Sequence, residues 1–242
     1  MTRALNILSL PGRYRAFARD WRHFAKQARD LSDNRFRLDW SDRMPALWEN
    51  SVTTAFDAHY VYHTAWAVRM VTGIAPKKHL DISSTLYFCT TLSATIPVEF
   101  YDYRPASLTL DGLTCGRADL TKLAFASNSV ESLSCMHTIE HVGLGRYGDP
   151  IDPRGDLKAA AELSRVVKPG GHLLMVTPVG KPRICFNAHR IYSFDQICAM
   201  FAAFSVVKTA LVKDNRDFVC NSSKVDFDSQ SYGCGCFLLR KN

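Results

Sequence analysis

The sequence predicts an α/β fold, in which a doubly wound, mostly parallel sheet follows an N-terminal helical extension. Short apolar segments typical of strands alternate with segments whose apolar residues recur at helical spacing. This alternation places parallel strands between two layers of helices. The predicted strands span residues 79–82, 98–103, 130–136, 172–177, 206–212 and 235–240, and the predicted helices span residues 86–95, 157–167 and 193–204.

Length and composition limit the class of protein. The 242 residues, 47% of them hydrophobic and 22% charged, suffice for one well-filled core. No apolar run approaches the roughly 18 residues that a membrane-spanning helix needs. The eight cysteines are scattered without a C-x-x-C pair, which excludes a zinc ribbon and a disulfide framework. We therefore expect one α/β domain over residues 76–242, an extension over residues 1–75, and a cytoplasmic location.

The N-terminal extension carries most of the net charge of +7. Residues 1–29 hold seven basic residues, Arg3 among them, and a single acid, so this segment alone accounts for +6 of that charge. Over residues 13–31, aromatic and apolar side chains recur every three or four positions, which predicts a basic amphipathic helix. A second helical pattern over residues 55–71 is ended by Gly73 and Pro76.

Two interpretations of the basic helix stay open. In the first interpretation, its apolar side packs on its own domain or on a second copy of the chain, and the second copy would make the protein a homo-oligomer. Alternatively, residues 13–31 bind an anionic membrane surface and make the protein peripheral at the inner face of the membrane. Because the remaining residues are nearly neutral, the charge does not favour a nucleic-acid partner.

Acidic side chains follow three of the strands. Asp81 and Asp102 end the first two strands, about 20 residues apart, and Asp119 follows a weaker third strand. That interval allows the second acid to reach a ribose hydroxyl, because ligands of open parallel sheets lie beyond the carboxyl ends of the strands. Each acid alone would also suit a helix cap or a turn. Together they predict a nucleoside site.

The segment after the strand at residues 130–136 matches a second pattern. His137, Glu140 and His141 satisfy the H-x-x-E-H arrangement of one class of zinc peptidases. We set this interpretation aside because the motif directly follows a buried strand and no helix of suitable length surrounds it. Gly143 also follows too soon for such a helix. We therefore expect no metal ion.

From about Lys77 onward, the order of segments resembles the class I methyltransferases that use S-adenosylmethionine. The resemblance depends on His79-Leu-Asp-Ile-Ser-Ser84, Phe100-Tyr-Asp102, Ala118-Asp-Leu120, Ile139-Glu-His-Val142 and Val166-Val-Lys-Pro-Gly-Gly171. It implies a Rossmann-like, seven-stranded methyltransferase fold with S-adenosylmethionine as cofactor. More narrowly, residues 143–150 and 185–190 resemble a methyltransferase-like family of unassigned function associated with glycan and polysaccharide biosynthesis.

The resemblance also assigns roles to residues. Asp102 would hold the ribose hydroxyls, Asp119 and Leu120 the adenine, and Asp81 with the following loop the methionine part. Ser83, Ser84 and His137 complete the cofactor residues that the resemblance implies. A carboxylate can accept hydrogen bonds from both ribose hydroxyls, which agrees with the role of Asp102.

The first loop departs from the family pattern Asp-x-Gly-x-Gly-x-Gly. Ser83, Thr85 and Tyr87 occupy the glycine positions, where side chains narrow the space and disfavour positive φ. Ser83 could still present its backbone amide to the cofactor. The departure keeps a second hypothesis open, a catalytically inactive methyltransferase-like binding or scaffold protein in a membrane-proximal glycan assembly.

Methyl transfer requires alignment of the reacting atoms and, for an alcohol acceptor, a base. His141 and His189 are the candidate bases, because a neutral imidazole accepts a proton near neutral pH. Arg146 and Arg190 would clamp an anionic group such as a phosphate or a sugar acid. Asp149, in a turn, and Asn187 complete the predicted substrate site. The resemblance implies O-methylation of a sugar or glycan precursor, so the expected partner is a small-molecule or glycan substrate.

Overall fold

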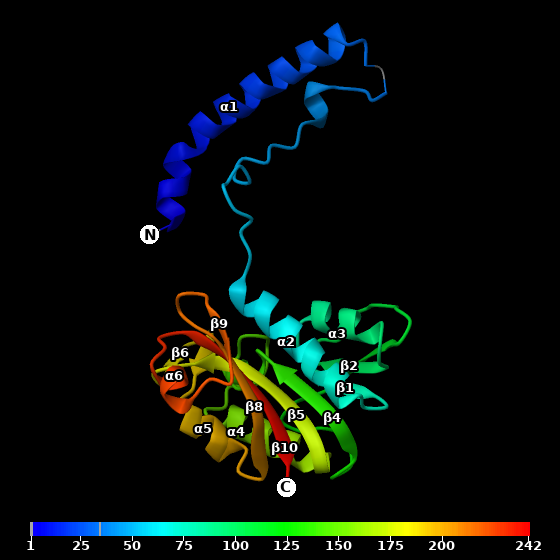
Figure 1. Ribbon diagram of the computed structural model, residues 1–242, viewed down its shortest axis with the longest axis vertical. Coiled ribbons are helices and arrows are strands. Elements are labelled where there is room, and N and C mark those ends of the chain that lie inside the picture. The colour runs from blue at the N-terminus through cyan, green and yellow to red at the C-terminus, as the bar shows by residue number, and fades with distance from the viewer. Residues whose placement is uncertain (1, 34) are drawn as a thin grey trace. The chain divides into compact units, whose positions relative to one another are not determined.

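The computed structural model describes residues 2–33 and 35–242, with side chains from Leu10 onward, so the Arg3 side chain lies outside it. The chain divides into two compact units, residues 1–56 and residues 57–242 (Figure 1). Each unit has its own internal contacts. No helix in the described ranges is both long enough and apolar enough to cross a membrane.

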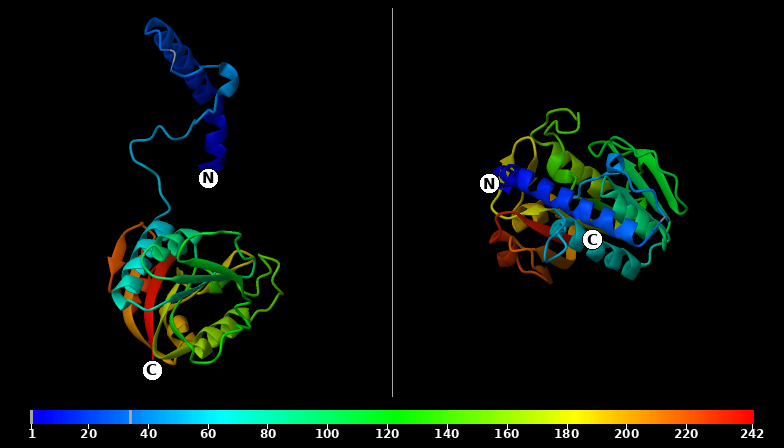
Figure 2. Two further views of the ribbon diagram at one scale, coloured as in Figure 1. Left: turned by 90° about the vertical axis from the view of Figure 1, so that its right-hand side faces the viewer. Right: turned by 90° about the horizontal axis from the view of Figure 1, so that it is seen from above.

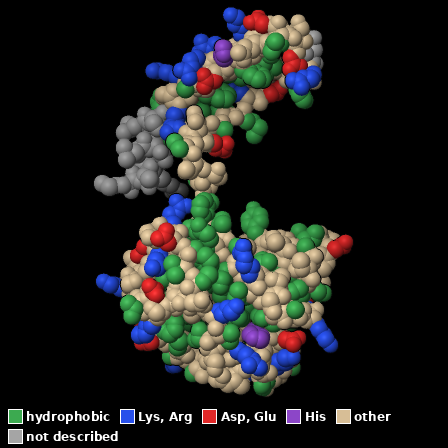
Figure 3. All heavy atoms as spheres, viewed as in Figure 1, with side chains coloured by type: hydrophobic (Ala, Val, Ile, Leu, Met, Phe, Trp, Pro, Cys, Tyr) green, Lys and Arg blue, Asp and Glu red, His purple; other side chains and the backbone are tan. Residues whose placement is uncertain are grey.

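The first unit consists of a long helix and a segment that folds back on it. The helix α1 (Thr2–Asp30) begins well before the predicted residue 13 and continues through Pro11. A short 3-10 turn, η1 (Trp40–Asp42), places the Trp40 ring against the Trp21 ring, with a centroid distance of 4.9 Å. Basic side chains are spread over the surface of this unit (Figure 3).

Part of the apolar side of α1 is therefore covered by the same chain. Phe17 also contacts the Trp40 ring, at 6.0 Å. Other aromatic and aliphatic side chains of this helical segment have no such cover: Phe24 is 60% exposed and Leu31 is 78% exposed. The first unit thus contains both internal packing and free apolar surface.

The second unit is built on an eight-stranded sheet in the order β3-β2-β1-β4-β5-β10-β8-β9. Strands β1 to β5 pair in parallel, whereas β10 runs antiparallel to β5 and β8. The sheet is mostly parallel and doubly wound, as the sequence predicts. The strands are β1 (His79–Ile82), β2 (Val98–Asp102), β3 (Leu113–Arg117), β4 (Val130–Met136), β5 (Val167–Val179), β8 (Phe204–Val212), β9 (Phe218–Cys220) and β10 (Gly233–Lys241).

Some elements differ from the prediction in length or number. The strand β9 adds an eighth, edge strand, and β6 (Arg183–Cys185) pairs with β7 (His189–Ile191) in a separate hairpin. Strand β5 includes Lys168-Pro-Gly-Gly171, which lies between the predicted helix over residues 157–167 and the predicted strand over residues 172–177. Gly170 adopts a φ of +75° and the pairing of β4 with β5 shifts register there, so the segment bulges without leaving the sheet.

Helices cover both faces of this sheet (Figures 1 and 2). On one face lie α2 (Ala58–Ile74) and α3 (Leu86–Ser93), and on the other lie α4 (Gly155–Val166), α5 (Phe194–Met200) and α6 (Lys224–Asp228). Each face has its own core. Trp66, Ala67 and Val71 of α2 are buried against Phe88 and Leu92 of α3.

The helix α2 therefore belongs to the α/β unit, whereas the sequence pattern predicted an extension that includes it and ends at residue 75. The division falls between residues 56 and 57. The physical reason is that Trp66, Ala67 and Val71 lose their contact with water only by covering the sheet.

The chain order of the strands reverses between β1 and β4. The carboxyl ends of β1, β2, β3 and β4 all meet at this edge of the sheet, and their loops diverge there. Such a switch point is the usual ligand position in open α/β sheets.

Candidate functional site

A cavity of about 380 Å³ opens at the switch point. Its volume lies within the range of roughly 300–1,000 Å³ that is typical of small-molecule sites. Side chains that follow the first four strands line it, and a loop before α4 closes its far side. We call it the switch-point cavity; its lining includes Ser83, Asp102, Ala118, Asp119, Leu120, His137, Thr138, His141, Tyr147 and Asp149.

The two carboxylates of this cavity, Asp102 and Asp119, are held by their own turns. Asp102 Oδ1 accepts a hydrogen bond from the Arg104 amide at 2.6 Å. Asp119 Oδ1 accepts from the amide and the hydroxyl of Thr121, at 2.8 and 2.7 Å. Among the hydrogen bonds of the described residues, Oδ2 of neither carboxylate has a partner. Each acid therefore combines a fixed position with one uncommitted oxygen at the cavity.

Ser83 lines the cavity in a backbone conformation that glycine would adopt more easily, with a φ of +59°. Its amide is not free for a ligand, because it donates to the Tyr101 carbonyl at 2.7 Å. This corrects the expectation that Ser83 presents its amide. Its carbonyl in turn accepts from the Thr138 hydroxyl at 2.9 Å. Ser83 thus joins the loops after β1 and β4.

Thr85 and Tyr87, at the other two positions where the family pattern has glycine, do not line the cavity. Tyr87 lies on α3 and is 83% exposed. Side chains at these positions therefore do not fill the space, contrary to the expectation from the loop sequence.

Asp81 and Ser84 do not line the cavity either. Asp81 is fully buried at the end of β1, where it accepts hydrogen bonds from the Ser134 hydroxyl and from the Ser84 amide. Burial raises the pKa of this carboxyl to about 6. The Ser84 hydroxyl accepts from the Met136 amide at 3.0 Å. Both residues join β1 to β4 and do not face a ligand.

The same network fixes a histidine in the core. His79 contacts the hydroxyls of Ser132 and Ser134 through Nδ1 and Nε2, at 2.7 and 2.8 Å. Because the Ser134 hydroxyl donates to Asp81, it must accept from His79, so Nε2 carries the proton. Burial lowers the pKa of His79 to about 3, which keeps the ring neutral. These hydrogen bonds thus connect β1 to β4 beside the switch-point cavity.

A second cavity, of about 330 Å³, adjoins the first. His137, His141 and Tyr147 line both, so these three side chains stand where the two spaces meet. We call it the histidine cavity; its lining is Asp57, His59, Tyr60, His137, Glu140, His141, Arg146, Tyr147, His189 and Tyr232.

The tautomer of His141 follows from its contacts. Its Nδ1 lies 2.6 Å from the Ala188 carbonyl, which can only accept, so Nδ1 carries the proton and Nε2 keeps its lone pair. Nε2 lies 3.8 Å from Glu140 Oε1. Burial is the main cause that lowers the pKa of His141, and the nearby Glu140 opposes it. The ring is therefore a neutral proton acceptor at the junction of the cavities.

His189 lines the histidine cavity from β7, with its ring 5.0 Å from the Tyr232 ring. Burial lowers its pKa as well. The structure thus brings both candidate bases to one cavity, although only His141 reaches the switch-point cavity.

The loop between the two cavities is organised by Asp149. Its carboxylate accepts from the amides of Gly143 at 2.7 Å and Tyr147 at 3.2 Å. Gly143 adopts a φ of +81°, and a side chain there would collide with the Asp152 carbonyl. Asp149 therefore shapes the wall, although it also lines the switch-point cavity.

The two arginines that were predicted to clamp an anion have different positions. Arg146 lines the histidine cavity, donates to the Ala188 carbonyl at 2.9 Å and lies 5.2 Å over the Tyr147 ring. Arg190 is 4% exposed, donates to the Val142 carbonyl at 2.7 Å and pairs with Asp156 at 3.6 Å. The clamp predicted for Arg190 is therefore corrected to a structural role.

Asn187, the remaining predicted substrate residue, is exposed in the turn between β6 and β7 and lines neither cavity. Conversely, sequence reasoning missed His59 and Tyr60 of α2 and Tyr232 before β10, all at the histidine cavity. The only signal for the first two was the helical pattern over residues 55–71, which contains His59 and His63.

With this geometry established, comparison with known proteins assigns the family. The model of the family described as "Caenorhabditis protein of unknown function, DUF268" matches residues 120–241, just over half of the chain. The chain belongs to this family. The DUF268 match begins at Leu120 in the switch-point cavity and includes His137 and His141, whereas His59 precedes it. No curated protein matches this DUF268 chain.

Solved structures similar to this DUF268 protein include methyltransferases. The N-methyltransferase NodS from Bradyrhizobium japonicum, in complex with S-adenosylhomocysteine, is 13% identical with a TM-score of 0.54, over 81% of this chain and 91% of NodS. The YcgJ protein from Bacillus subtilis is 12% identical with a TM-score of 0.50, over 74% of this chain and 97% of YcgJ. At these identities the likeness establishes the Rossmann-like methyltransferase fold.

Proposed function

We propose that this chain is a methyltransferase that uses S-adenosylmethionine. The observation that carries the proposal is the placement of Asp102 and Asp119. They follow adjacent strands, line one cavity and each keep an oxygen without a partner. An acceptor for ribose hydroxyls and an acceptor for the adenine amino group are what a nucleoside requires.

The residues of the switch-point cavity fit the cofactor. Leu120 and Ala118 supply apolar surface beside Asp119, and the loop of Ser83 closes the cavity beside Asp102. S-adenosylmethionine, when bound, supplies a methyl group on a positively charged sulfur. Asp102 and Asp119 would orient the nucleoside, and the junction at His137 and His141 would receive the other end.

For the methyl acceptor we propose an oxygen of a sugar or glycan precursor in the histidine cavity. His141 Nε2 has the lone pair that a hydroxyl acceptor needs as a base. Arg146, Tyr60 and Tyr232 offer hydrogen-bond donors and aromatic surface on the same cavity. NodS is named an N-methyltransferase, which has a different acceptor atom, nitrogen. The oxygen assignment therefore depends on the base and on the resemblance of residues 143–150 and 185–190.

Calorimetric titration of the full-length chain with S-adenosylmethionine and with S-adenosylhomocysteine tests the proposal. We expect saturable binding of both at one site per chain. Absence of heat at millimolar ligand would refute cofactor binding and favour the second candidate, an inactive methyltransferase-like binding protein. That candidate is favoured by one observation, the Ser83 amide that donates to Tyr101 and leaves one donor fewer for the cofactor.

We further propose that α1 attaches the chain to an anionic membrane surface from the cytoplasmic side. The support is the basic composition of residues 13–31 together with exposed Phe24 and Leu31. Deletion of residues 1–31 should reduce sedimentation with vesicles that contain phosphatidylserine and leave sedimentation with neutral vesicles unchanged. Undiminished sedimentation with the anionic vesicles would contradict this proposal.

A further inference from the structure

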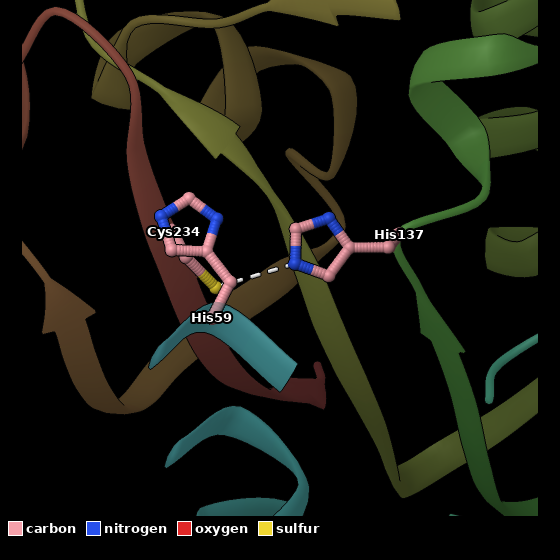
Figure 4. Close-up of side chains that lie close together, drawn as sticks. All are labelled: His59, His137 and Cys234. Atoms are coloured by element: carbon pink, nitrogen blue, oxygen red, sulfur yellow. Dashed lines mark hydrogen bonds between the residues drawn. The ribbon is translucent and has the colours of Figure 1, made fainter. Parts of the chain in front are cut away.

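Three side chains from distant parts of the chain meet beside the histidine cavity. His59 comes from the first turn of α2, His137 follows β4, and Cys234 lies in β10 (Figure 4). One ligand atom from each lies within 4.8 Å of the other two. Two imidazole nitrogens and a sulfur form the donor set that zinc prefers.

The contacts of His137 direct one ring nitrogen into this cluster. His137 Nδ1 lies 3.1 Å from Glu140 Oε1, and Nε2 lies 3.3 Å from Cys234 Sγ, the contact dashed in Figure 4. The carboxylate accepts the Nδ1 proton, so Nε2 has its lone pair toward the sulfur. Histidines that bind metal usually donate their other nitrogen to a carboxylate in this way.

Glu140 is buried, and other side chains hold its carboxylate in place. Its side chain is 1% exposed, and Oε2 accepts from the Thr177 hydroxyl at 3.4 Å. A buried carboxylate is costly unless it is hydrogen-bonded, so its contacts with His137 and Thr177 matter for stability as well. The acid of the H-x-x-E-H motif therefore orients the His137 ring. The same oxygen, Glu140 Oε1, lies 3.8 Å from His141 Nε2, so the carboxylate faces both histidines of the motif.

The surroundings of His59 support its place in the cluster. Its ring is stacked with that of His137 at a centroid distance of 6.0 Å and an interplanar angle of 11°. The His59 carbonyl accepts from His63 Nδ1 at 2.7 Å. His63 in turn lies edge-on to His137 at 5.0 Å. Helix α2 thus holds His59 and supports His137 from the same side.

We propose that His59, His137 and Cys234 bind a zinc ion whose fourth position opens onto the histidine cavity. In a tetrahedral site, zinc–ligand distances of about 2.0–2.3 Å place sulfur and nitrogen roughly 3.6 Å apart and two nitrogens roughly 3.3 Å apart. The contact of 3.3 Å between Cys234 and His137 needs a small expansion, and His59 moves inward by about 1.5 Å at most.

The open fourth coordination position distinguishes the proposed zinc site from a structural zinc site. Three protein ligands with a free fourth position are typical of catalytic zinc, whereas structural zinc has four. His59 and His137 line the histidine cavity, while Cys234 is buried behind them. The free position therefore faces the space where the acceptor would bind.

The consequence for the reaction rests on the proposed function. An acceptor hydroxyl on zinc becomes more acidic and releases its proton to His141 Nε2. The oxygen then forms a bond to the methyl carbon as the bond between carbon and sulfur breaks. The products are the methyl ether and the neutral thioether, and the positive charge moves from sulfur to the His141 imidazole.

Metal analysis of the full-length chain tests the site without any assay of activity. Protein purified without chelators should contain one zinc per chain by plasma mass spectrometry. Cys234→Ser and His59→Ala should each lose it, whereas the matched controls Cys220→Ser and His189→Ala should retain it, because neither control residue belongs to the cluster. Glu140→Gln should bind zinc about 10–100-fold more weakly.

Cobalt gives a second measurement that depends on the sulfur. Chelator-treated protein titrated with cobalt should develop a thiolate-to-metal charge-transfer band, and Cys234→Ser should lack it. Circular dichroism establishes that each variant is folded. His59→Ala keeps the test decisive if Cys234→Ser does not fold, since position 59 lies in the first helical turn and is not fully buried.

The results distinguish this proposal from the proposed function. Zinc-free native protein, zinc that survives His59→Ala, or uptake of copper without zinc would each overturn the metal site. If S-adenosylmethionine still binds the zinc-free protein, the cofactor proposal stands without the metal. If zinc binds with the expected variant pattern and no cofactor binding is found, the metal site stands and the methyltransferase proposal fails.

Discussion

Replacement of Asp102 by Asn should weaken binding of S-adenosylhomocysteine by roughly 10- to 150-fold. Asp102 Oδ1 is committed to the Arg104 amide at 2.6 Å, so Oδ2 is the oxygen left for a ribose hydroxyl. Asn retains an acceptor for the Arg104 amide and loses the charge. A hydrogen bond to a charged group contributes about 1.5–3 kcal/mol, and about 1.4 kcal/mol corresponds to a tenfold change in affinity.

Isothermal calorimetry on the full-length variant measures this change directly. Asp111→Asn is the matched control, because Asp111 is exposed in the loop between β2 and β3 and lines neither cavity. Its affinity should equal that of the native protein. If Asp102→Asn binds as tightly as Asp111→Asn, the nucleoside does not contact Asp102 and its placement in the switch-point cavity is wrong.

Three further predictions concern stability, each measured by urea unfolding. Arg190→Met should lower the free energy of unfolding by roughly 3–5 kcal/mol, because it leaves a buried carboxylate unpaired; an unchanged value would restore the substrate-clamp interpretation. Gly143→Ala should lower the free energy of unfolding more than Gly148→Ala, because both glycines adopt positive φ but only position 143 of the two lacks room for a Cβ. The backbone strain alone costs about 1–2 kcal/mol. Equal losses for the two variants would contradict the collision at position 143. The free energy of unfolding should fall as the pH falls from about 6.5 toward 3. Burial lowers the pKa of His79 to about 3, so in this range the unfolded chain binds a proton that the folded chain does not. His79→Gln should flatten this decline, and a native protein that gains stability on acidification would refute the reasoning.

The fold was largely predictable because its signals are local. Apolar strands separated by helical segments produce the parallel sheet, and β1 and β4 have the predicted bounds. The elements β6, β7 and β9 escaped prediction because they have three residues each, too few to show a period. The bulge in β5 escaped because a Pro-Gly-Gly segment predicts a break unless neighbouring strands hold it.

The acidic residues of the switch-point cavity were predictable from the strand ends. Asp102 and Asp119 line one cavity because the carboxyl ends of parallel strands meet at one edge. Burial in the tertiary structure decided whether the other predicted side chains reach a cavity. Asp81 ends a strand in the same way, yet hydrogen bonds from Ser134 and Ser84 keep its carboxylate in the core. No pattern along the chain distinguishes these two situations.

The sequence by itself determined that the protein has an α/β sheet with acids at the carboxyl ends of its strands and a basic N-terminal helix. These features depend on periodicity and charge over short segments. The tertiary structure alone decided which arginine is buried and which reaches a cavity. It also brought His59, His137 and Cys234 together. Their proximity results from α2 and β10 packing beside the end of β4, and contacts between such distant segments leave no local signal in a single sequence.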